Sequence, residues 1–416
     1  MKLRIEKAIY GGDGLARDSG KAVFVPGTLP GEVVEAAIVA DRRGFATSKL
    51  QAILEPSAER VAPSCEYVPL CGGCQYQHAN PVFQLQMKLD ILQETLARAH
   101  LPAPGQIATL AGPAWAYRNR IRLHVMAGAL GYRQRGSHRL LPIGHCPIAA
   151  PLLEQAIPVV ARVPHIADLC QEVEFFTNSE QDQMLLSLWP DPKQRMKQGV
   201  AERALEAFAE TVHSALPGLS GVGLFLPQTV LHWGQPSLTY TVAGSSYQVS
   251  LGSFFQTNRF LAPDLLELVT KGRSGRLAWD LYSGVGLFAR ALQFENVTAV
   301  ESDGFSASDL KRNLATTRHS VIDSGTLDFL RSRVAAQQKP DLIVVDPPRA
   351  GLGKEVCGHL AQVAAANMIY ISCDPATLSR DLQSLLLSGY SIETIYLVDL
   401  FPQTFHMETV TFLKRN

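Results

Sequence analysis

From about residue 250 to the end of this 416-residue chain, short apolar runs alternate with segments of helical pattern. This alternation is typical of β-α-β units, which build a parallel sheet with helices on both faces. The predicted strands are Leu277–Leu281, Val297–Glu301, Asp341–Val345, Met368–Ser372 and Thr394–Val398, and the predicted helices are residues 304–316, 352–365 and 376–387. A last strand, His406–Leu413, follows its predecessor so closely that it is predicted to be antiparallel. Residues 248–416 are therefore predicted to form a doubly wound, mostly parallel α/β sheet of Rossmann-like type.

The first predicted strand leads into a turn with two glycines, Asp280-Leu281-Tyr282-Ser283-Gly284-Val285-Gly286-Leu287. Glycines at this turn let the backbone approach a ligand, and Glu301, which ends the second strand, can accept hydrogen bonds from ribose hydroxyls. The turn lacks the third glycine of a dinucleotide fingerprint, and S-adenosylmethionine has no pyrophosphate to cradle. A plain tight turn would have the same glycine pair. Together with Asp328 and Asp346 near the ends of later strands, the turn predicts an S-adenosylmethionine site.

Three strings near the C-terminus carry reactive side chains: Asp346-Pro347-Pro348-Arg349, Ser372-Cys373-Asp374-Pro375 and His406-Met407-Glu408. Amino-group methyltransferases have an aromatic residue where the first string has arginine. Carbon 5 of uracil is a poor nucleophile, so its alkylation needs a thiolate added at C6 and a base that later removes the C5 proton. A cysteine and a carboxylate can do these two jobs. A cysteine after an apolar strand is usually a buried small hydrophobe, which we accept for Cys357, but the paired Glu408 favours a nucleophile at the second string.

With these strings the chain resembles the RNA (uracil-5-)-methyltransferase family along nearly its whole length. The resemblance includes Ser253-Phe254-Phe255-Gln256-Thr257-Asn258, which in this family helps to hold the flipped base and the cofactor. It implies that Cys373 is the nucleophile, that Glu408 takes the C5 proton and that Asp346 orients the base edge or the cofactor amine. It also implies that Phe254 stacks on the uracil, which must leave the base stack to be reached. The implied contacts to S-adenosylmethionine are Gln256, Tyr282, Gly284, Leu287, Glu301, Asp328 and Asp346, although many family members have a polar residue at the position of Leu287.

Four of the seven cysteines are grouped as Cys65-x5-Cys71-x2-Cys74 with a later Cys146. Disulfides are rare in the cytoplasm, where we place the protein, so this grouping indicates a metal site, either zinc or a [4Fe–4S] cluster. The spacing is similar to that of the cluster-bearing branch of the same family. That similarity implies a [4Fe–4S] cluster with a structural or RNA-positioning role, because the methyl transfer needs no electron. Cys170 lies outside the group and is predicted to be structural.

The remaining residues divide into two predicted domains. Residues 1–58 have short β-like runs and glycine turns, which predict a small barrel that resembles the oligonucleotide-binding-like TRAM domain. Residues 59–247 are predicted to form an α+β domain with an amphipathic helix over 81–99 that can pack on the methyltransferase domain. Residues 111–145 contain six arginines, interleaved aromatic residues and no acidic residue, which suits phosphates and unstacked bases, although a solvated basic face has the same composition. The predicted RNA-binding residues are Arg118, Arg120, Arg122 and Arg133.

Two rival functions use some of the same features. A radical S-adenosylmethionine methylthiotransferase also combines a TRAM-like barrel with a cluster, but it would need Cys-x3-Cys-x2-Cys and a TIM-type barrel. A catalytically silent RNA-binding or ribosome-assembly protein would not need Cys373, Glu408 and Asp346.

The full-length resemblance favours 23S ribosomal RNA as substrate, with the T-loop uridine of transfer RNA as the alternative. We further expect a cytoplasmic monomer that binds neither DNA nor a membrane, because no apolar run approaches the roughly 18–20 residues that span a bilayer and the N-terminus has no secretory h-region.

Overall fold

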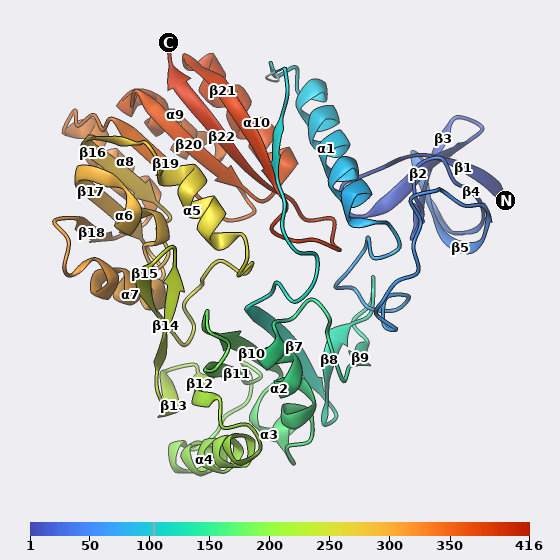
Figure 1. Ribbon diagram of the computed structural model, residues 1–416, viewed down its shortest axis with the longest axis horizontal. Helices are drawn as coiled ribbons and strands as arrows, with labels where there is room; N and C mark the ends of the chain where they lie inside the picture. The colour runs from blue at the N-terminus through green and yellow to red at the C-terminus, as the bar shows by residue number, and fades with distance from the viewer. Residues whose placement is uncertain (103–104) are drawn as a thin grey trace.

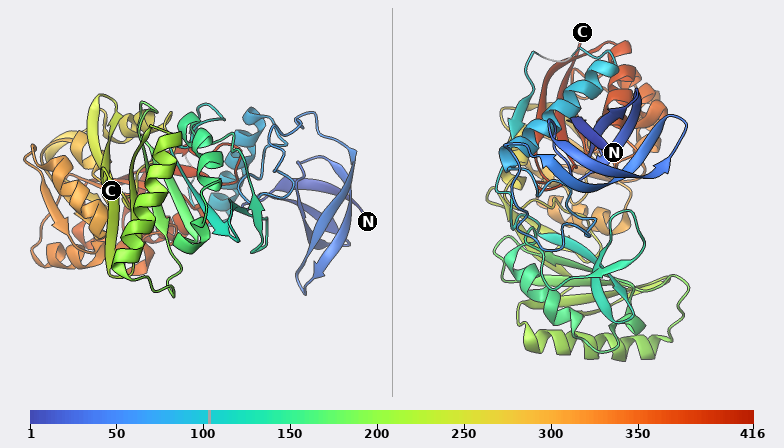
Figure 2. Two further views of the ribbon diagram at one scale, coloured as in Figure 1. Left: turned by 90° about the horizontal axis from the view of Figure 1, so that it is seen from below. Right: turned by 90° about the vertical axis from the view of Figure 1, so that its right-hand side faces the viewer.

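The computed structural model describes residues 1–102 and 105–416 and contains three sheet-based units (Figure 1). A barrel, a seven-stranded sheet and an eight-stranded sheet follow one another along the chain. Helix α1 (Pro81–Arg98) and the hairpin of β14 (Ser237–Val242) and β15 (Ser245–Ser250) lie between consecutive units in the sequence. In Figure 2 the barrel projects from one end of the molecule. No helix in the described part of the chain is long and apolar enough to cross a membrane.

The N-terminal strands close into the predicted barrel in the order β1-β2-β3-β5-β4. They are β1 (Lys2–Ala8), β2 (Asp13–Asp18), β3 (Lys21–Pro26), β4 (Val33–Asp41) and β5 (Phe45–Glu55). Side chains alternate along the first residues of β1, so that Leu3 and Ile5 are buried while Lys2 and Arg4 are exposed. Closure pairs the strand edges that an open sheet of this size would leave free.

The central unit is a seven-stranded sheet of order β13-β12-β11-β10-β7-β8-β9. Its strands are β7 (Arg120–Met126), β8 (Ala129–Arg133), β9 (Leu140–Pro142), β10 (Glu172–Thr177), β11 (Met184–Trp189), β12 (Leu219–Leu226) and β13 (Thr229–Gly234). Its helices are α2 (Pro151–Ala161), α3 (Ile166–Leu169) and α4 (Gln198–Ala215). Helix α4, at the bottom of Figure 1, packs its apolar face on β12 and β13.

The C-terminal unit is the predicted doubly wound sheet, of order β18-β17-β16-β19-β20-β22-β21-β6. Its strands are β16 (Ser274–Leu281), β17 (Gln293–Glu301), β18 (Ser320–Asp323), β19 (Leu342–Val345), β20 (Asn367–Ser372), β21 (Tyr390–Val398) and β22 (Glu408–Arg415). Its helices are α5 (Ala262–Thr270), α6 (Leu287–Ala291), α7 (Gly304–Leu314), α8 (Thr326–Ala335), α9 (Gly353–Val363) and α10 (Pro375–Leu387). Strand β22 lies between β20 and β21 and is antiparallel to both, which confirms the prediction for the last strand.

The bounds and number of the strands differ in several places from the sequence prediction: β17 and β21 also begin earlier than predicted, and β18 was not predicted. Strand β16 begins at Ser274, earlier than predicted, because its first residues are exposed and give no apolar signal while they pair with β17. Strand β6 (Ala108–Leu110) lies far from the C-terminal segment in sequence, yet it pairs in parallel with β21 at the sheet edge. A three-residue strand is too short to show a periodic pattern.

The core of the C-terminal unit is formed by its central strands and by helices that include α1. All four residues of β19 are buried, as expected of a strand covered by helices on both faces. Helix α1 buries Met87, Ile91 and Leu92 in the same apolar cluster as α10 and β20. Its N-terminus is capped by Asn80, whose Oδ1 accepts the Phe83 N–H at 2.9 Å. Helix α1 therefore packs on the C-terminal sheet, and its Glu94 forms an ion pair with Lys7 of the barrel.

Candidate active site

The carboxyl ends of β16, β19 and β20 meet the start of antiparallel β22 at one edge of the C-terminal sheet. Cys373 follows β20, Asp346 follows β19 and Glu408 opens β22. Ser372 pairs with Thr409, so that Cys373 and Glu408 occupy the next positions outward on neighbouring strands. The Thr409 hydroxyl also donates to the Ser372 carbonyl at 3.1 Å. The fold thus brings the three predicted catalytic residues to the edge where open α/β sheets bind ligands.

These three groups carry raised pKa values. Burial and the neighbouring Asp346 raise the pKa of Glu408 well above its usual range, and its Oε1 has no hydrogen-bond partner among the described residues. Burial raises the pKa of Asp346 to about 7. Burial and the charges of Glu408 and Asp346 raise the pKa of the Cys373 thiol to about 12, although Arg349 opposes this shift. A cation placed here would lower all three pKa values, so the site is suited to a positively charged ligand.

Two neighbours of Cys373 have structural roles. Asp374 caps helix α10, since its Oδ1 accepts the N–H groups of Ala376 and Thr377 at 3.0 and 2.9 Å. Tyr10, from the barrel, donates its hydroxyl to the Cys373 carbonyl at 3.4 Å. Its ring also packs edge-on against Phe405, with centroids 5.2 Å apart. Sequence reasoning missed Tyr10, because a contact across 363 residues leaves no local pattern.

The turn after β16 has the backbone that its glycines predict, with φ values of 55° at Gly284 and 93° at Gly286. A Cβ on Gly286 would lie 2.7 Å from a Leu310 methyl, so this glycine lets α7 pack against the turn. A Cβ on Gly284 would meet no described atom within 4 Å, so this glycine faces open space. Glu301 accepts the Gly284 N–H at 2.8 Å. Tyr282 also has a left-handed backbone, at φ 63°, which is a strained conformation for a tyrosine.

The other predicted cofactor and base contacts lie in different surroundings. Gln256 donates its side-chain amide to Asp346 at 3.4 Å, and Phe254 is 57% exposed next to the buried Phe255. Leu287 is only 5% exposed, with its side chain in the hydrophobic core. Asp328 is exposed on α8, where it pairs with Arg331 at 3.1 Å. The fold therefore brings Gln256 to Asp346, whereas Leu287 faces the core and Asp328 the surface.

Asp280, at the end of β16, is a candidate that sequence reasoning did not select. It is fully buried, and its Oδ1 has no partner in the described part of the chain, while its Oδ2 accepts the Ala289 N–H at 2.9 Å. Burial, with the nearby Asp346 and Glu301, raises its pKa to about 8. The sequence did contain one signal for this residue, because Asp280 directly precedes the glycine turn that was predicted to bind the cofactor. A buried carboxyl with an unsatisfied oxygen is suited to receive a cationic group of a ligand.

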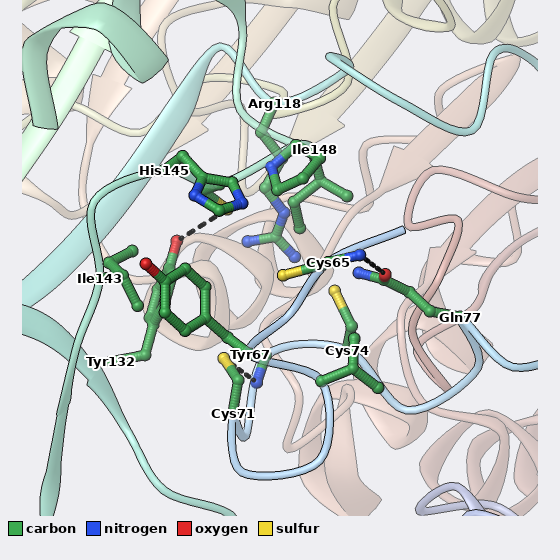
Figure 3. Close-up of a pocket in the computed structure, with 14 residues that line it drawn as sticks. Cys65, Tyr67, Cys71, Cys74, Gln77, Arg118, Tyr132, Ile143, His145 and Ile148 are labelled. Atoms are coloured by element: carbon green, nitrogen blue, oxygen red, sulfur yellow. Dashed lines mark hydrogen bonds between the residues drawn. The ribbon is translucent and has the colours of Figure 1, made fainter. Parts of the chain in front are cut away.

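The four grouped cysteines line one cavity between the loop of residues 65–74 and the central sheet (Figure 3). The cavity has a volume of about 50 Å³, several times the roughly 10–15 Å³ that one water molecule needs. All four are free thiols, and burial raises their pKa values. The sulfur atoms of Cys65, Cys71 and Cys74 point toward a common space, and the Tyr132 hydroxyl lies 3.8 Å from the sulfur of Cys146.

The spacing of these side chains can be compared with the spacing that a single metal ion requires. Around one zinc ion, tetrahedral thiolates lie about 3.8 Å apart, as follows from a Zn–S bond of about 2.3 Å. Within residues 1–102 and 105–416, no three His, Cys, Asp or Glu side chains are close enough to hold an ion in this way. Four buried thiols that line one cavity are the ligand type of an iron–sulfur group.

The four arginines predicted to bind RNA have protein partners. Arg120 donates to Glu174 at 2.6 Å, and Arg122 to the same carboxylate at 2.9 Å. Arg118 lines the cysteine cavity. Arg133 is exposed, and its guanidinium contacts His138 at 2.8 Å. The acid-free stretch 111–145 thus faces glutamates of β10, a pairing that only the sheet topology reveals.

Comparison with known proteins supports one family. The sequence pattern of the family described as tRNA (Uracil-5-)-methyltransferase matches residues 237–416, and that of the TRAM domain matches residues 1–50. An uncharacterized RNA methyltransferase of Streptomyces coelicolor is 32% identical, with 99% of this chain and 92% of the relative covered. The 23S rRNA (uracil(1939)-C(5))-methyltransferase of Pectobacterium atrosepticum is 31% identical, with 96% of this chain and 90% of the relative covered.

A solved structure has the same fold throughout. The tRNA (uracil-54, C5)-methyltransferase of Pyrococcus abyssi, in complex with S-adenosyl-L-homocysteine, superposes with a TM-score of 0.77 at 21% identity. The superposition covers 99% of this chain and 100% of that one.

A doubly wound sheet with an antiparallel last strand and a glycine turn after its first strand defines an S-adenosylmethionine-dependent methyltransferase of class I. Within that class, the chain belongs to the RNA (uracil-5-)-methyltransferase family and carries an N-terminal TRAM domain. The predictions of family, fold class and enzyme class are therefore confirmed.

Proposed function

We propose that this enzyme methylates C5 of a uridine in 23S ribosomal RNA. The observation that carries the proposal is the pairing of β20 with β22, which sets Cys373 and Glu408 side by side at the ligand-binding edge. The Pectobacterium relative, named for this activity, supports the choice of 23S ribosomal RNA. The alternative, a transfer-RNA uridine, has the support of the name of the archaeal structural neighbour.

The proposed chemistry begins at Cys373. Its thiolate forms a bond to uracil C6, and the electron pair of the C5–C6 double bond moves toward the C4 carbonyl to give an enolate. Bound S-adenosylmethionine supplies an electrophilic methyl group, to which C5 forms its new bond as the sulfonium becomes a neutral thioether. Glu408 then takes the C5 proton, the C5–C6 double bond re-forms and the C6–S bond breaks to regenerate the thiolate. Atoms and charges balance without an added oxidant or reductant.

The electrostatics of the site suit this sequence. At neutral pH the Cys373 thiol is protonated in the free protein, because its pKa is raised to about 12. A cationic ligand next to Asp346 would offset the negative charge that holds this pKa high. The same cationic ligand would lower the raised pKa of Glu408, so that its unpartnered Oε1 can accept the C5 proton. We propose that Asp346, held by Gln256, orients the base edge or the cofactor amine.

The proposed donor pocket lies over the glycine turn. Gly284 faces open space, Glu301 lies next to it, and Asp280 offers its unpartnered oxygen to a positive group. Tyr282 and Gln256 would form its sides. Phe254, exposed beside this edge, would stack on the flipped uracil.

We further propose that Cys65, Cys71, Cys74 and Cys146 hold a [4Fe–4S] cluster. The support is the cavity that the four buried thiols line together with Arg118 and Tyr132. Burial raises the pKa values of these four thiols, and coordination to iron would stabilise them as thiolates. The cluster would serve as a structural brace, since the methyl transfer needs no electron.

The three proposed domains, residues 1–58, 59–247 and 248–416, would divide the work on RNA. The TRAM barrel and the exposed Arg133 would grip RNA beside the catalytic edge, which Tyr10 already reaches from the barrel. We propose a monomer, because one chain supplies every group named here. Since its proposed substrate is ribosomal RNA, we place its action in the cytoplasm.

The test is methyl transfer from labelled S-adenosylmethionine to separate pools of unmodified ribosomal RNA and transfer RNA, with the product nucleoside identified by mass. The proposal expects 5-methyluridine in 23S RNA. Label only in transfer RNA would support the alternative substrate. No label in either pool, with the cluster's visible absorbance intact, would favour a silent RNA-binding protein.

A further inference from the structure

The segment of residues 399–407, which ends directly before Glu408, is held by donors from distant parts of the chain. Asn258 donates to the Leu400 carbonyl at 3.0 Å, Lys88 of α1 to the Phe401 carbonyl at 2.9 Å, and Tyr117 to the Pro402 carbonyl at 3.0 Å. The Gln403 carbonyl accepts the N–H groups of Gln75 and Tyr76 at 3.0 and 2.9 Å. Four consecutive carbonyls are therefore fixed from four different places.

Gln403 is the most constrained residue of this segment. It is 2% exposed, and its backbone is left-handed at φ 69°. Its N–H donates to the Gln84 side-chain oxygen at 2.8 Å, and its own Oε1 accepts from the Gln84 amide at 2.9 Å. A non-glycine residue keeps such a conformation only where its surroundings hold it. The reciprocal pair with Gln84, which is 1% exposed, provides that hold.

The parts that hold the segment lie outside the catalytic sheet. Gln84 and Lys88 belong to α1, and Lys88 is fully buried in an ion pair with Asp399 at 2.6 Å. Gln75 directly follows Cys74 of the cysteine cavity, and its Oε1 accepts the Phe405 N–H at 3.4 Å. Buried polar groups are costly unless they are paired, so this concentration around one short segment indicates that its position matters.

We propose that Gln84 and Gln403 are positioning residues that place Glu408 for removal of the C5 proton. The inference rests on the proposed function, because it names the step that the pair serves. Cys373 is held by β20 and by the capped start of α10, and its link to the 399–407 segment runs through Tyr10, which packs on Phe405 rather than on Gln403. Loosening the 399–407 segment therefore leaves thiolate addition and methyl transfer largely intact and slows the elimination that releases RNA.

The experiment measures, within a single turnover, the formation of the covalent adduct and the release of the methylated product. Labelled RNA from the pool that the wild type methylates is mixed with excess enzyme and S-adenosylmethionine. A denaturing gel then measures the covalent RNA–protein adduct, and mass analysis of nucleosides measures released 5-methyluridine. Gln84→Met keeps the side-chain volume but loses both hydrogen bonds to Gln403 and the one to the Ala79 carbonyl. In this variant the adduct forms at near the wild-type rate and its release slows about tenfold. Gln86→Met is the matched control, since Gln86 is exposed on the same helix and pairs only with Asp90 in the described structure.

Release at the wild-type rate in Gln84→Met would overturn the inference, and so would equal slowing of adduct formation and release. If Gln84→Met does not fold, Gln403→Gly replaces it, because glycine accepts φ 69° and removes only the side-chain partner. The same slow release is expected there, and its absence would again contradict the inference. Wild-type enzyme that forms neither adduct nor 5-methyluridine would instead refute the proposed function, and this inference with it.

Discussion

At the scale of single residues, chemistry is set by surroundings. Cys357 and Cys373 are both partly or fully buried cysteines near the same sheet, and burial raises both pKa values to about 12. They differ because Cys357 contacts the Asp381 carbonyl within the helical layer, whereas Cys373 stands opposite Glu408. Of the two thiols, Cys373 is the one at the carboxyl ends of the strands, next to Glu408 and Asp346.

The two proposed catalytic residues predict different blocked states. In Glu408→Gln the amide keeps the shape but cannot take the C5 proton, so a methylated covalent adduct is expected to accumulate. Product release should fall by about 10²-fold or more, the usual contribution of a general base.

In Cys373→Ala neither adduct nor 5-methyluridine should form, while RNA binding measured by filter retention stays unchanged. Undiminished turnover of Cys373→Ala would remove this residue from the role of nucleophile.

The buried Asp280 predicts a pH dependence of stability. Its pKa is raised from 3.8 to about 8, so the folded state holds its proton more tightly than the unfolded state does. Its contribution to stability is therefore fully present below about pH 3.8 and is lost as the pH rises toward 8. In Asp280→Asn, the midpoint of thermal unfolding should fall less steeply between pH 5 and about pH 8 than in the wild type. Parallel curves for the two proteins would contradict the assignment of this slope to Asp280.

At the scale of elements, two glycines in one turn do different work. Gly286 allows α7 to pack, and Gly284 opens onto the proposed donor pocket. The sequence shows both glycines but cannot tell them apart, because the difference depends on Leu310, which a later helix brings in. Helix α10 begins one residue before its predicted start at residue 376, whereas β6 gave no signal in the sequence. Local chemistry predicts where elements begin, and packing decides what each residue contacts.

The two glycines therefore predict separable defects. Gly286→Ala combines a strained φ of 93° with a contact of 2.7 Å to Leu310, and we expect it to lower the free energy of unfolding by about 2 kcal/mol or more. Gly284→Ala should cost only about 1 kcal/mol of stability, because φ is 55° and its Cβ meets open space. It should nevertheless weaken S-adenosylmethionine binding at least tenfold by calorimetry. Unimpaired binding in Gly284→Ala would place the donor elsewhere.

At the scale of the whole molecule, parts of the chain outside the C-terminal sheet meet near the edge where Cys373 and Glu408 lie. Tyr10 comes from the barrel, Gln75 and Tyr76 from the segment that follows the cysteine loop, and Gln84 from α1. The surroundings of the arginine stretch also depend on tertiary structure, because Glu174 on another strand forms ion pairs with Arg120 and Arg122. Composition along the chain could not indicate this, since the partners are more than fifty residues apart.

The cysteine cavity predicts a metal group that can be removed selectively. Cys74→Ala should lose visible absorbance together with iron and sulfide, and should loosen the 399–407 segment that the following residues hold. Cys170→Ala is the control, because that thiol is also buried but lies outside the cavity, in the hydrophobic core, where it donates to the Ile166 carbonyl. Metal analysis of both purified variants decides the matter. Full iron and sulfide in Cys74→Ala, or zinc in the wild type, would contradict the cluster.

By itself, the sequence determined the doubly wound sheet, the glycine turn, the barrel and the identity of Cys373, Glu408 and Asp346 as candidates, because alternating polarity, turn residues and ordered strings are local properties. Tertiary structure alone decided the rest. It brought Asp280, Tyr10 and Gln403 into the argument, and it turned Leu287 toward the core and Asp328 toward solvent. The physical reason is that burial, shared hydrogen bonds and shifted pKa values arise between residues far apart in the chain, and no local pattern records them.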